Sequence, residues 1–456
     1  MDSSYHSTAL YLAIAVIFFL LVAIWRKTRN IGFIIGILYL YLWSLHGAWI
    51  ILRTYQVGQP VETGLFLKLF PVHIDATYFS TIVLYALFIV IIGSVVLLTT
   101  KSPQSFRREK CDILKGRSFV FFIISVLGFI GSLYFTRGAR QFASLSDLSI
   151  YQAFGPGNNY EGRNLYTLHS LMLIVALFSS VLSIALTFSG NRAKYLTIDN
   201  RKASFFFNGI MMVILCVYTA YLGDRSKLLS AFVMGILVYL TNTRRPRTGM
   251  VTIVGVLGAL SINVLQVIRG IPARDLVKAI TWERFYYGFM SMLNSGEFFA
   301  AHFSLYGVIR YNVPLTGGTS FWSFVFSMFL PRALFPDRPE NIYWHYVRHV
   351  GALSVQGYTI HHAAGWYLNF GIIGIVAGAV FFGWIWSKLF NYSHNSSFKK
   401  NSLIEIYKRF GFCFFTAYIP IVIRAGIEGY KSIIIGAFVV PILILWASTI
   451  RVKIIL

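Results

Sequence analysis

The sequence predicts an all-α polytopic integral membrane protein with about 11 transmembrane helices. Of its 456 residues, 57% are hydrophobic and only 12% are charged, which is about half the charged fraction of an ordinary soluble domain. Apolar runs near the length that crosses a bilayer recur along the chain. The basic residues lie mainly in short turns between these runs, a pattern that indicates membrane topology rather than nucleic-acid binding.

The expected spans follow the apolar runs in chain order. The first run, 8–25, has no basic leading segment and no small-residue cleavage site, so we expect a retained helix. Two runs, 228–241 and 410–423, are short, and the expected count therefore ranges from 10 to 12. The other runs cover about 31–52, 78–98, 119–136, 168–188, 205–222, 249–267, 364–387 and 432–450.

The distribution of charge predicts the orientation. If the N-terminus lies outside, the cytoplasmic turns hold 23 of the 40 basic residues but only four of the 16 acidic ones. Positively charged turns stay on the cytoplasmic side of a membrane. We therefore expect the N-terminus outside and the C-terminus in the cytoplasm.

One long outer loop divides the chain into three parts. Residues 1–267 are expected to form an N-terminal bundle of about eight helices, 268–363 the loop, and 364–456 about three further helices. The other turns are short, so the elaborated surface of the protein is expected to lie outside.

Two stretches of this loop are apolar and aromatic enough to form interfacial helices, 285–309 and 321–330. Glu297 and His302 interrupt the first stretch, which argues against a span that faces lipid. We therefore expect a largely helical loop that packs on the membrane face.

Arginines recur at the expected outer ends of helices, at Arg225, Arg269 and Arg424. A guanidinium group matches phosphate oxygens with a two-pronged hydrogen-bonding fork, so these residues favour an anionic, phosphate-bearing ligand. The alternatives are that they reach lipid headgroups or pair with acids, as Arg424 would with Glu428 if the helix continued.

Histidines are the other chemical signal of the loop. His345 and His349 are spaced so that they share a helical face, but no acid accompanies them and Arg348 lies between them, which disfavours a metal cation. The pair His361 and His362, just before a span, is better placed for proton transfer, because imidazole titrates near neutral pH. A hydrogen-bonded interfacial role is the alternative for each.

Several kinds of chemistry lack their sequence signals. The chain has no Walker-type phosphate loop, dinucleotide fingerprint or nucleophile elbow, and its three cysteines are scattered. We therefore expect no cofactor, metal or nucleotide, and an outer-face reaction would need a substrate that is already activated, such as a lipid diphosphate.

Two short motifs resemble those of the bacterial oligosaccharide repeat unit polymerases, the Wzy-type O-antigen polymerases. The segment 331–339, PRALFPDRP, looks like the Pro-Arg-x-x-x-Pro-x-Lys/Arg-Pro stretch of that family, and 223–227, GDRSK, is similar to its Gly-x-Arg-Ser/Gly turn. The number of spans and the large late outer loop also fit.

The resemblance implies a GT-C-like glycosyltransferase bundle in the bacterial inner membrane, working on its periplasmic face in the biosynthesis of lipopolysaccharide or a related surface polysaccharide. Its donor and acceptor would be oligosaccharide repeat units linked to undecaprenyl diphosphate, and a chain-length regulator would be a further partner. No nucleotide, metal or nucleic acid would be needed.

The resemblance also implies roles for particular residues. Preorganised guanidinium groups would stabilise the departing diphosphate more than the ground state, and His361 or His362 would be the general base, with Glu297 in reserve because a carboxylate in an apolar stretch can have a raised pKa. The expected diphosphate-binding arginines are Arg225, Arg269, Arg332, Arg338 and Arg424.

Three other functions compete with polymerisation. An O-antigen ligase has the same architecture but transfers finished glycan to lipid A core. A flippase carrying the same lipid would be expected to show internal repeats or helices broken at mid-membrane, and the apolar runs show neither clearly. A scaffold for polysaccharide assembly would need neither the arginines nor the histidines.

Overall fold

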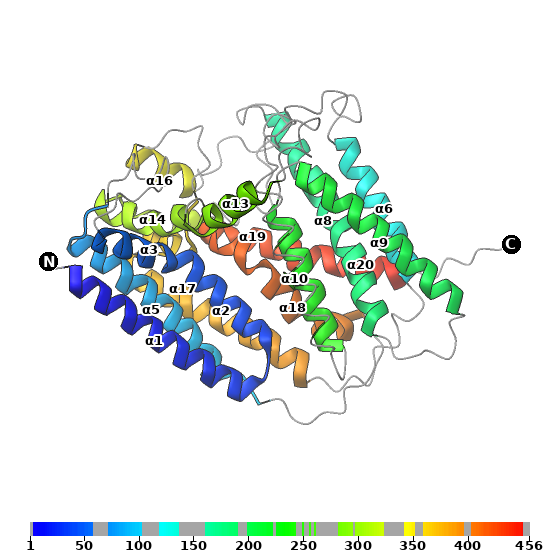
Figure 1. The fold of residues 1–456 in the computed structure, drawn as a ribbon, viewed down its shortest axis with the longest axis horizontal. Coiled ribbons are helices and arrows are strands. Elements are labelled where there is room, and N and C mark those ends of the chain that lie inside the picture. Colours follow the sequence, from blue (N-terminus) through cyan, green and yellow to red (C-terminus); the bar gives the residue numbers. More distant parts are fainter. Residues whose placement is uncertain are drawn as a thin grey trace. The chain divides into compact units, whose positions relative to one another are not determined.

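The computed structural model describes residues 3–57, 72–102, 118–135, 160–189, 198–221, 225–242, 249, 255–256, 260, 281–294, 297–322, 342–351, 359–395 and 403–449. The regular structure of these residues is helical (Figure 1), apart from one isolated parallel bridge that joins Ile360 to Ala425. The all-α class expected from the sequence is therefore confirmed.

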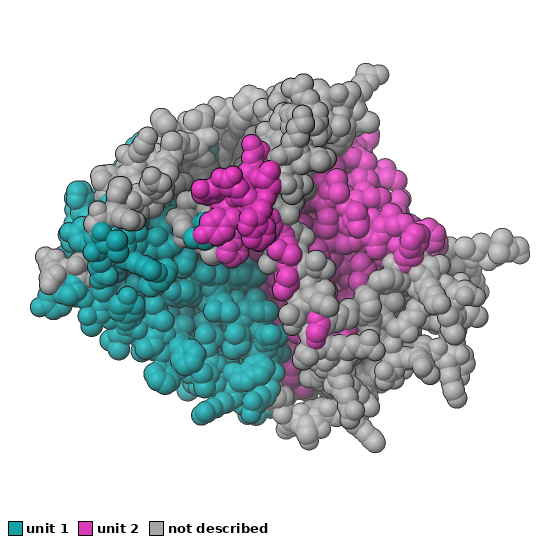
Figure 2. Space-filling model, viewed as in Figure 1, with its two compact units in different colours: residues 1–104, 290–392, 418–434 teal, residues 105–289, 393–417, 435–456 magenta. Residues whose placement is uncertain are grey.

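The chain folds into two compact units whose residues alternate along the sequence (Figure 2). Unit 1 comprises 1–104, 290–392 and 418–434, and unit 2 comprises 105–289, 393–417 and 435–456. This division by packing differs from the division by sequence at residues 267 and 363, because segments far apart in the chain pack together in each unit.

Unit 1 begins with four helices, α1 (Ser3–Thr28), α2 (Ile31–Ser44), α3 (His46–Gln56) and α5 (Ala76–Thr99). Their starts follow the usual capping rules: the side chain of Asn30 accepts from the backbone N–H of Gly32 at the start of α2, and that of Asp75 accepts from two backbone N–H groups at the start of α5. In Figure 1, α1, α2 and α5 lie side by side.

The remaining helices of unit 1 come from the second half of the chain. They are α14 (Glu297–Arg310), α16 (Ile342–Val350), α17 (His362–Asn395, within unit 1 up to residue 392), the 3-10 turn η4 (Gly426–Glu428) and α19 (Gly429–Ile433). Helix α14 packs against α2, α3 and α5, and its ten consecutive residues 299–308 are all buried. This part of the stretch 285–309 is therefore a buried helix rather than an interfacial one.

Unit 2 contains α6 (Ser118–Phe135), α8 (Tyr160–Ser189), α9 (Ile198–Tyr221), α10 (Arg225–Asn242), the π-helical turn η5 (Ile434–Val439, within unit 2 from residue 435) and α20 (Val440–Thr449). Helix α8 packs against α6, α9, α10 and α20. Two helices, α13 (Trp282–Asn294) and α18 (Leu403–Ile423), are divided between the units at residues 289 and 417.

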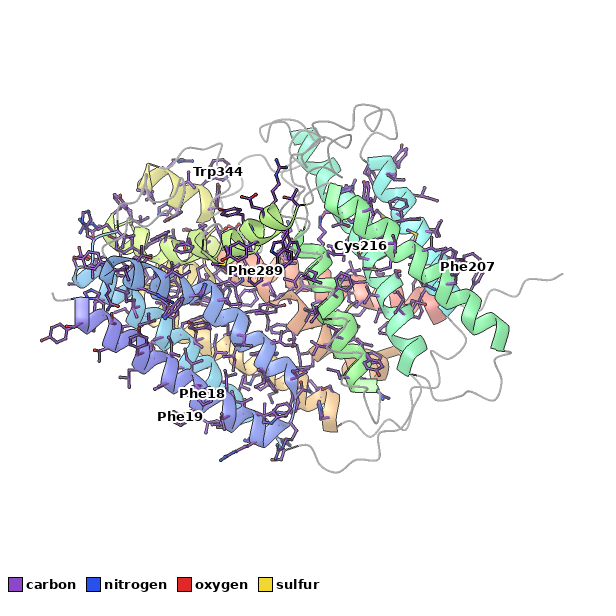
Figure 3. All side chains as sticks on the ribbon, in the orientation of Figure 1. Phe18, Phe19, Phe207, Cys216, Phe289 and Trp344 are labelled. Atoms are coloured by element: carbon purple, nitrogen blue, oxygen red, sulfur yellow. The ribbon has the colours of Figure 1, made fainter. Side chains whose placement is uncertain are left out.

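Small residues allow close packing in the core of unit 1. The ring of Trp386 lies directly against Gly36, so that a side chain there would collide with it, and the same ring packs against Phe33 at 4.8 Å between centroids. The outer surface of α1 is instead apolar and exposed: Phe18 is 60% and Phe19 70% exposed, and both point away from the bundle in Figure 3. An apolar face of this kind is expected where a helix meets lipid.

Five helices among the described residues are long and apolar enough to cross a membrane, and α2 with α3, bent by 46° at Leu45, would make a sixth. Helices α6, α9 and α10 contain shorter apolar stretches. The protein is thus consistent with a multi-pass membrane protein. The count of about 11 spans stays a prediction, and most of the run 249–267 lies outside the described residues.

The two ends of unit 1 differ in chemistry. At one end, which we call the lysine end, Lys27 donates to the carbonyl of Leu97 at 2.5 Å, and the side chain of Asn391 bonds both the N–H of Lys101 and the carbonyl of Thr99. The other end, which we call the histidine end, contains the starts of α1, α5 and α17 and the break between α2 and α3.

Candidate functional site

A buried polar cluster occupies the histidine end of unit 1. Its backbone frame is a junction of two irregular segments: the N–H of Gly426 donates to the carbonyl of Ile360 at 2.9 Å, and Gly365 packs so closely on Gly426 that a Cβ there would lie 2.9 Å from the Cα of Gly426. Gly426 has a positive φ of 58°, which glycine adopts without strain. Thus the start of α17 and the break after α18 meet at glycines.

His361 lies at this junction and is fully buried. Its Nδ1 accepts from the backbone N–H of Ala363 at 3.0 Å, so in the neutral ring the proton is on Nε2, which lies 2.9 Å from Oγ of Ser44. The backbone N–H of His361 donates to Oγ of Ser304 at 2.9 Å. Both ring nitrogens are therefore engaged within the protein.

His302, on α14, faces the same serine from another side. Its Nδ1 lies 2.6 Å from the carbonyl of Ser44 and must donate to it, which leaves Nε2 to accept from the hydroxyl of Tyr78 at 3.1 Å. The hydroxyl of Tyr85 bonds the carbonyls of Ala301 and His302. The C-terminus of α2 is thus held by hydrogen bonds to α14 and to the segment before α17.

His362 opens α17 and completes the cluster. Its Nδ1 donates to the carbonyl of Gly426 at 2.6 Å, and its Nε2 accepts from the indole N–H of Trp366 at 3.0 Å, with the hydroxyl of Tyr430 also 3.0 Å away. The ring thereby joins the start of α17 to the turn η4 and to α19.

Burial keeps the imidazole rings of His302 and His361, which lie outside the membrane-spanning helices, neutral. Burial lowers the pKa of His302 to about 4, although its hydrogen bond to Ser44 opposes the shift. The pKa of His361 is also lowered well below its usual value, first by burial and then by the neighbouring His362 and His302. Near pH 7 both rings are therefore uncharged, and they form their hydrogen bonds as neutral tautomers.

Arg424 lies beside this cluster, in the turn that follows α18. Its guanidinium carbon is 5.3 Å from the centroid of the Trp43 ring. The helix does not continue beyond Ile423, so Arg424 and Glu428 do not share a helical face; instead Oε1 of Glu428 accepts from the N–H of Ile342 at the start of α16, at 3.0 Å. The condition for the pairing that the sequence suggested, a helix that continues through both residues, is therefore not met.

The other expected site residues are less fully placed. Glu297 begins α14, five positions before His302, and Arg225 begins α10 in unit 2; the side chains of both lie outside the described parts. Arg269, Arg332 and Arg338 lie outside the described residues altogether. Of the expected residues, the structure thus brings together His361, His362 and Arg424.

The second histidine pair, His345 and His349, is engaged by backbone carbonyls. On α16, the rings of His345 and His349 are 4.4 Å apart between centroids, but Nε2 of His345 lies 2.8 Å from the carbonyl of Pro314 and Nδ1 of His349 lies 2.8 Å from the carbonyl of His345. Among the described residues, no three potential metal ligands come together.

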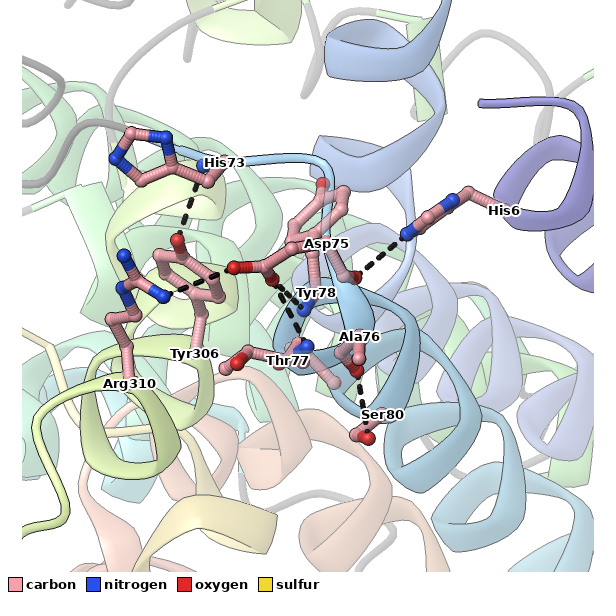
Figure 4. Close-up of polar contacts among 10 residues, drawn as sticks. His6, His73, Asp75, Ala76, Thr77, Tyr78, Ser80, Tyr306 and Arg310 are labelled. Atoms are coloured by element: carbon pink, nitrogen blue, oxygen red, sulfur yellow. Dashed lines mark hydrogen bonds and ion pairs between the residues drawn. The ribbon is translucent and has the colours of Figure 1, made fainter. Parts of the chain in front are cut away.

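A clamp at the surface of the histidine end ties three helices together (Figure 4). Oδ1 of Asp75 caps α5, while Oδ2 accepts from Nη1 of Arg310 on α14 at 3.0 Å. Nε2 of His6 on α1 lies 2.8 Å from the backbone carbonyl of Asp75, and the hydroxyl of Tyr306 accepts from the N–H of His73. The exposed ion pair adds little stability by itself, but the clamp fixes the register of α1, α5 and α14.

Sequence reasoning missed the residues that organise the cluster, above all Ser44, Ser304 and Tyr78. Each is a hydroxyl-bearing residue inside an apolar stretch, and all three are buried. A buried hydroxyl needs a hydrogen-bond partner, so a hydroxyl inside an apolar stretch was the sequence signal that could have indicated a polar cluster. The identity of the partner depends on the fold.

Comparison with protein-family models, with curated proteins and with solved structures finds no match to this chain. The function must therefore be argued from the residues themselves.

Proposed function

We propose that the protein is a membrane glycosyltransferase that polymerises oligosaccharide repeat units linked to undecaprenyl diphosphate into O-antigen or a related polysaccharide. The observation that carries the proposal is the junction at the histidine end, where His361, His362 and Arg424 come from distant segments joined by the Ile360–Ala425 bridge. The two sequence motifs and the apolar helices support the same function.

The proposed reaction needs no nucleotide or metal. A hydroxyl oxygen of the acceptor sugar attacks the anomeric carbon of the donor glycan, the bond from that carbon to the diphosphate oxygen breaks, and the hydroxyl proton passes to a base. Undecaprenyl diphosphate leaves with the bonding electron pair. Charge that grows on the diphosphate is stabilised by guanidinium groups already in place, a role proposed for Arg424 with Arg225, Arg269, Arg332 and Arg338.

His361, the proposed base, is neutral, but hydrogen bonds within the protein occupy its ring. The lowered pKa of His361 keeps the ring neutral near pH 7, and the same shift makes it a weaker base than a free imidazole. Its unprotonated nitrogen, Nδ1, however, already accepts from the backbone N–H of Ala363, and the ring of His362 is engaged by Gly426 and Trp366. Substrate binding would have to release Nδ1 of His361 from the N–H of Ala363; otherwise Glu297 is the base that we propose.

The test uses the purified full chain in detergent with lipid-linked repeat unit and with neither nucleotide nor metal. We expect a ladder of lengthened products. Loss of one preorganised guanidinium typically slows such a step by roughly a hundredfold, so Arg225→Ala should reduce the ladder by that order, whereas Lys388→Ala at the lysine end should leave it unchanged. Wild-type protein without a ladder would refute the polymerase.

One observation favours a second candidate, a flippase for the same lipid. Helices are interrupted at three places in unit 1: at Leu45, at Phe370–Gly371 within α17, and at 424–428. Broken helices at membrane depth commonly line the substrate sites of transporters. The same experiment in vesicles separates the candidates. A flippase would move the intact lipid across the membrane without lengthening its glycan. A ligase would transfer the glycan only when lipid A core is added.

A further inference from the structure

A row of aromatic rings follows the break between α2 and α3. The ring of Trp43 packs against Phe298 of α14 at 4.9 Å between centroids, and His46 contacts Phe298 at 6.4 Å and lies nearly parallel to Trp49 at 6.0 Å. We call Trp43, His46, Trp49 and Phe298 the aromatic row. All but Trp43 are partly exposed, so the row presents ring surface at the histidine end.

An arginine lies over each end of the row. The guanidinium carbon of Arg424 is 5.3 Å from the Trp43 ring centroid, and that of Arg53 is 5.3 Å from the Trp49 centroid. Stacking of this kind holds a guanidinium group in place. Arg53 is exposed, and among the residues that the structure describes no ion pair engages its hydrogen-bond donors.

The row is contiguous with the histidine cluster. Ser44 follows Trp43 directly, and its hydroxyl and carbonyl bond His361 and His302. Any ligand that reaches from Arg424 toward Arg53 would therefore begin beside the proposed reacting groups and continue along the rings.

Resting on the proposed function, we propose that the aromatic row and Arg53 form the binding surface for the sugars nearest the diphosphate of the lipid-linked glycan. Arg424 would bind phosphate oxygens with its fork. The parts of the His46 and Trp49 rings that are exposed beside their own stacking contacts would pack on the C–H faces of sugar rings, and Arg53 would donate to sugar hydroxyl or carboxylate groups.

The chemistry favours a glycan over an ordinary phospholipid. A phospholipid headgroup brings a phosphate for either arginine but no ring to cover the row. A sugar offers an apolar face to a stacked ring and polar edges to the donors around it, which is the combination that the row and its two arginines present.

The test measures binding by the full chain in nanodiscs of phosphatidylethanolamine and phosphatidylglycerol. The probes are undecaprenyl diphosphate and the same lipid carrying one N-acetylhexosamine. Trp49→Leu and Arg53→Gln should each raise the Kd for the sugar-bearing lipid about tenfold, which corresponds to about 1.4 kcal/mol, and leave the Kd for the bare lipid unchanged. Arg424→Gln should weaken both.

A matched pair at the lysine end supplies the control. Nζ of Lys388 lies 5.8 Å from the Trp384 ring centroid, so Trp384→Leu and Lys388→Gln remove the same kind of contact and should change neither Kd. Trp49→Phe keeps a flat ring and should retain most of the binding. This variant separates the loss of a ring in the aromatic row from misfolding.

The inference is overturned if wild-type protein does not bind the sugar-bearing lipid more tightly than the bare lipid. It is also overturned if the variants in the row bind as wild type, or weaken both lipids equally, which would mark a general headgroup contact. A protein that makes no polymer but discriminates the sugar through Trp49 would refute the proposed polymerase and leave this binding surface standing. A product ladder that the variants in the row do not change would support the proposed polymerase and refute this binding surface.

Discussion

At the scale of single residues, His302 shows how a buried histidine constrains stability. It is neutral in the fold, with a pKa of about 4 against 6.5 in the unfolded chain. The unfolded state therefore binds more protons than the folded state below pH 6.5. The stability that the neutral His302 ring contributes is thus present in full above pH 6.5 and is lost as the pH falls from 6.5 through 4. The loss amounts to about 3 kcal/mol at most. We expect the melting temperature in detergent to fall between pH 6.5 and 4.

The variant His302→Gln isolates this effect. Glutamine can still donate to the carbonyl of Ser44 and accept from Tyr78, but it does not titrate, so the melting temperature should depend less steeply on pH, with a loss of about 1–3 kcal/mol at pH 7 from poorer geometry. An equally steep pH profile in the variant would mean that other groups, such as His361 or the carboxylates, dominate acid unfolding.

At the scale of elements, the break in α17 is stabilised from outside the helix. Gly371 has a φ of 63°, and the carbonyl of Leu368 accepts from the N–H of Thr316 at 2.7 Å. Oδ1 of Asn369 accepts from the hydroxyls of Thr316 and Ser320, while its Nδ2 donates to the carbonyl of Gly365. The segment after α14 is thus docked on α17 through one buried asparagine.

We expect Asn369→Ala to release this segment, because it removes the acceptor of the Ser320 hydroxyl and the nearer of the two acceptors of the Thr316 hydroxyl, at a cost of about 1–3 kcal/mol. Amide hydrogen exchange should accelerate across 313–322 and remain unchanged in α10 of unit 2. Asn391→Ala, which removes an asparagine from the same helix at the lysine end, should leave 313–322 protected. Unchanged exchange in Asn369→Ala would show that the edge-on contact of Phe321 with Trp366 is enough to hold the segment.

The sequence predicted the elements better than their interruptions. Apolar length located α1, α5, α8 and α17 because burial in lipid or protein acts on whole runs. The break at Leu45 has no proline to announce it and only Gly47 two residues later, and Ser44 beside it forms hydrogen bonds to distant histidines. Within the candidate site, residue type indicated His361, His362 and Arg424, but their partners are set by tertiary contacts that spacing does not encode.

At the scale of the whole molecule, the charge pattern and the packing of unit 1 agree on two opposed ends. Hydrogen bonds join the start of α1 to the start of α5 at the histidine end, and they join the ends of the same two helices at the lysine end. Arg26, Lys27 and Arg29 lie at the lysine end of α1, so the positive-inside rule assigns that end to the cytoplasm. We therefore propose that the histidine end, with the candidate site, faces the periplasm.

Single cysteines placed at the two ends test this orientation. Tyr55 on α3 is 58% exposed near the histidine end, and Lys101 is exposed at the lysine end. In cells with a permeabilised outer membrane, a maleimide that cannot cross the inner membrane should label Tyr55→Cys and should reach Lys101→Cys only after the inner membrane is opened. Wild-type protein supplies the background from its own cysteines. Labelling in the reverse order would place the histidine cluster in the cytoplasm, where lipid-linked repeat units are not polymerised under the proposed mechanism, and would refute the proposed function together with the orientation.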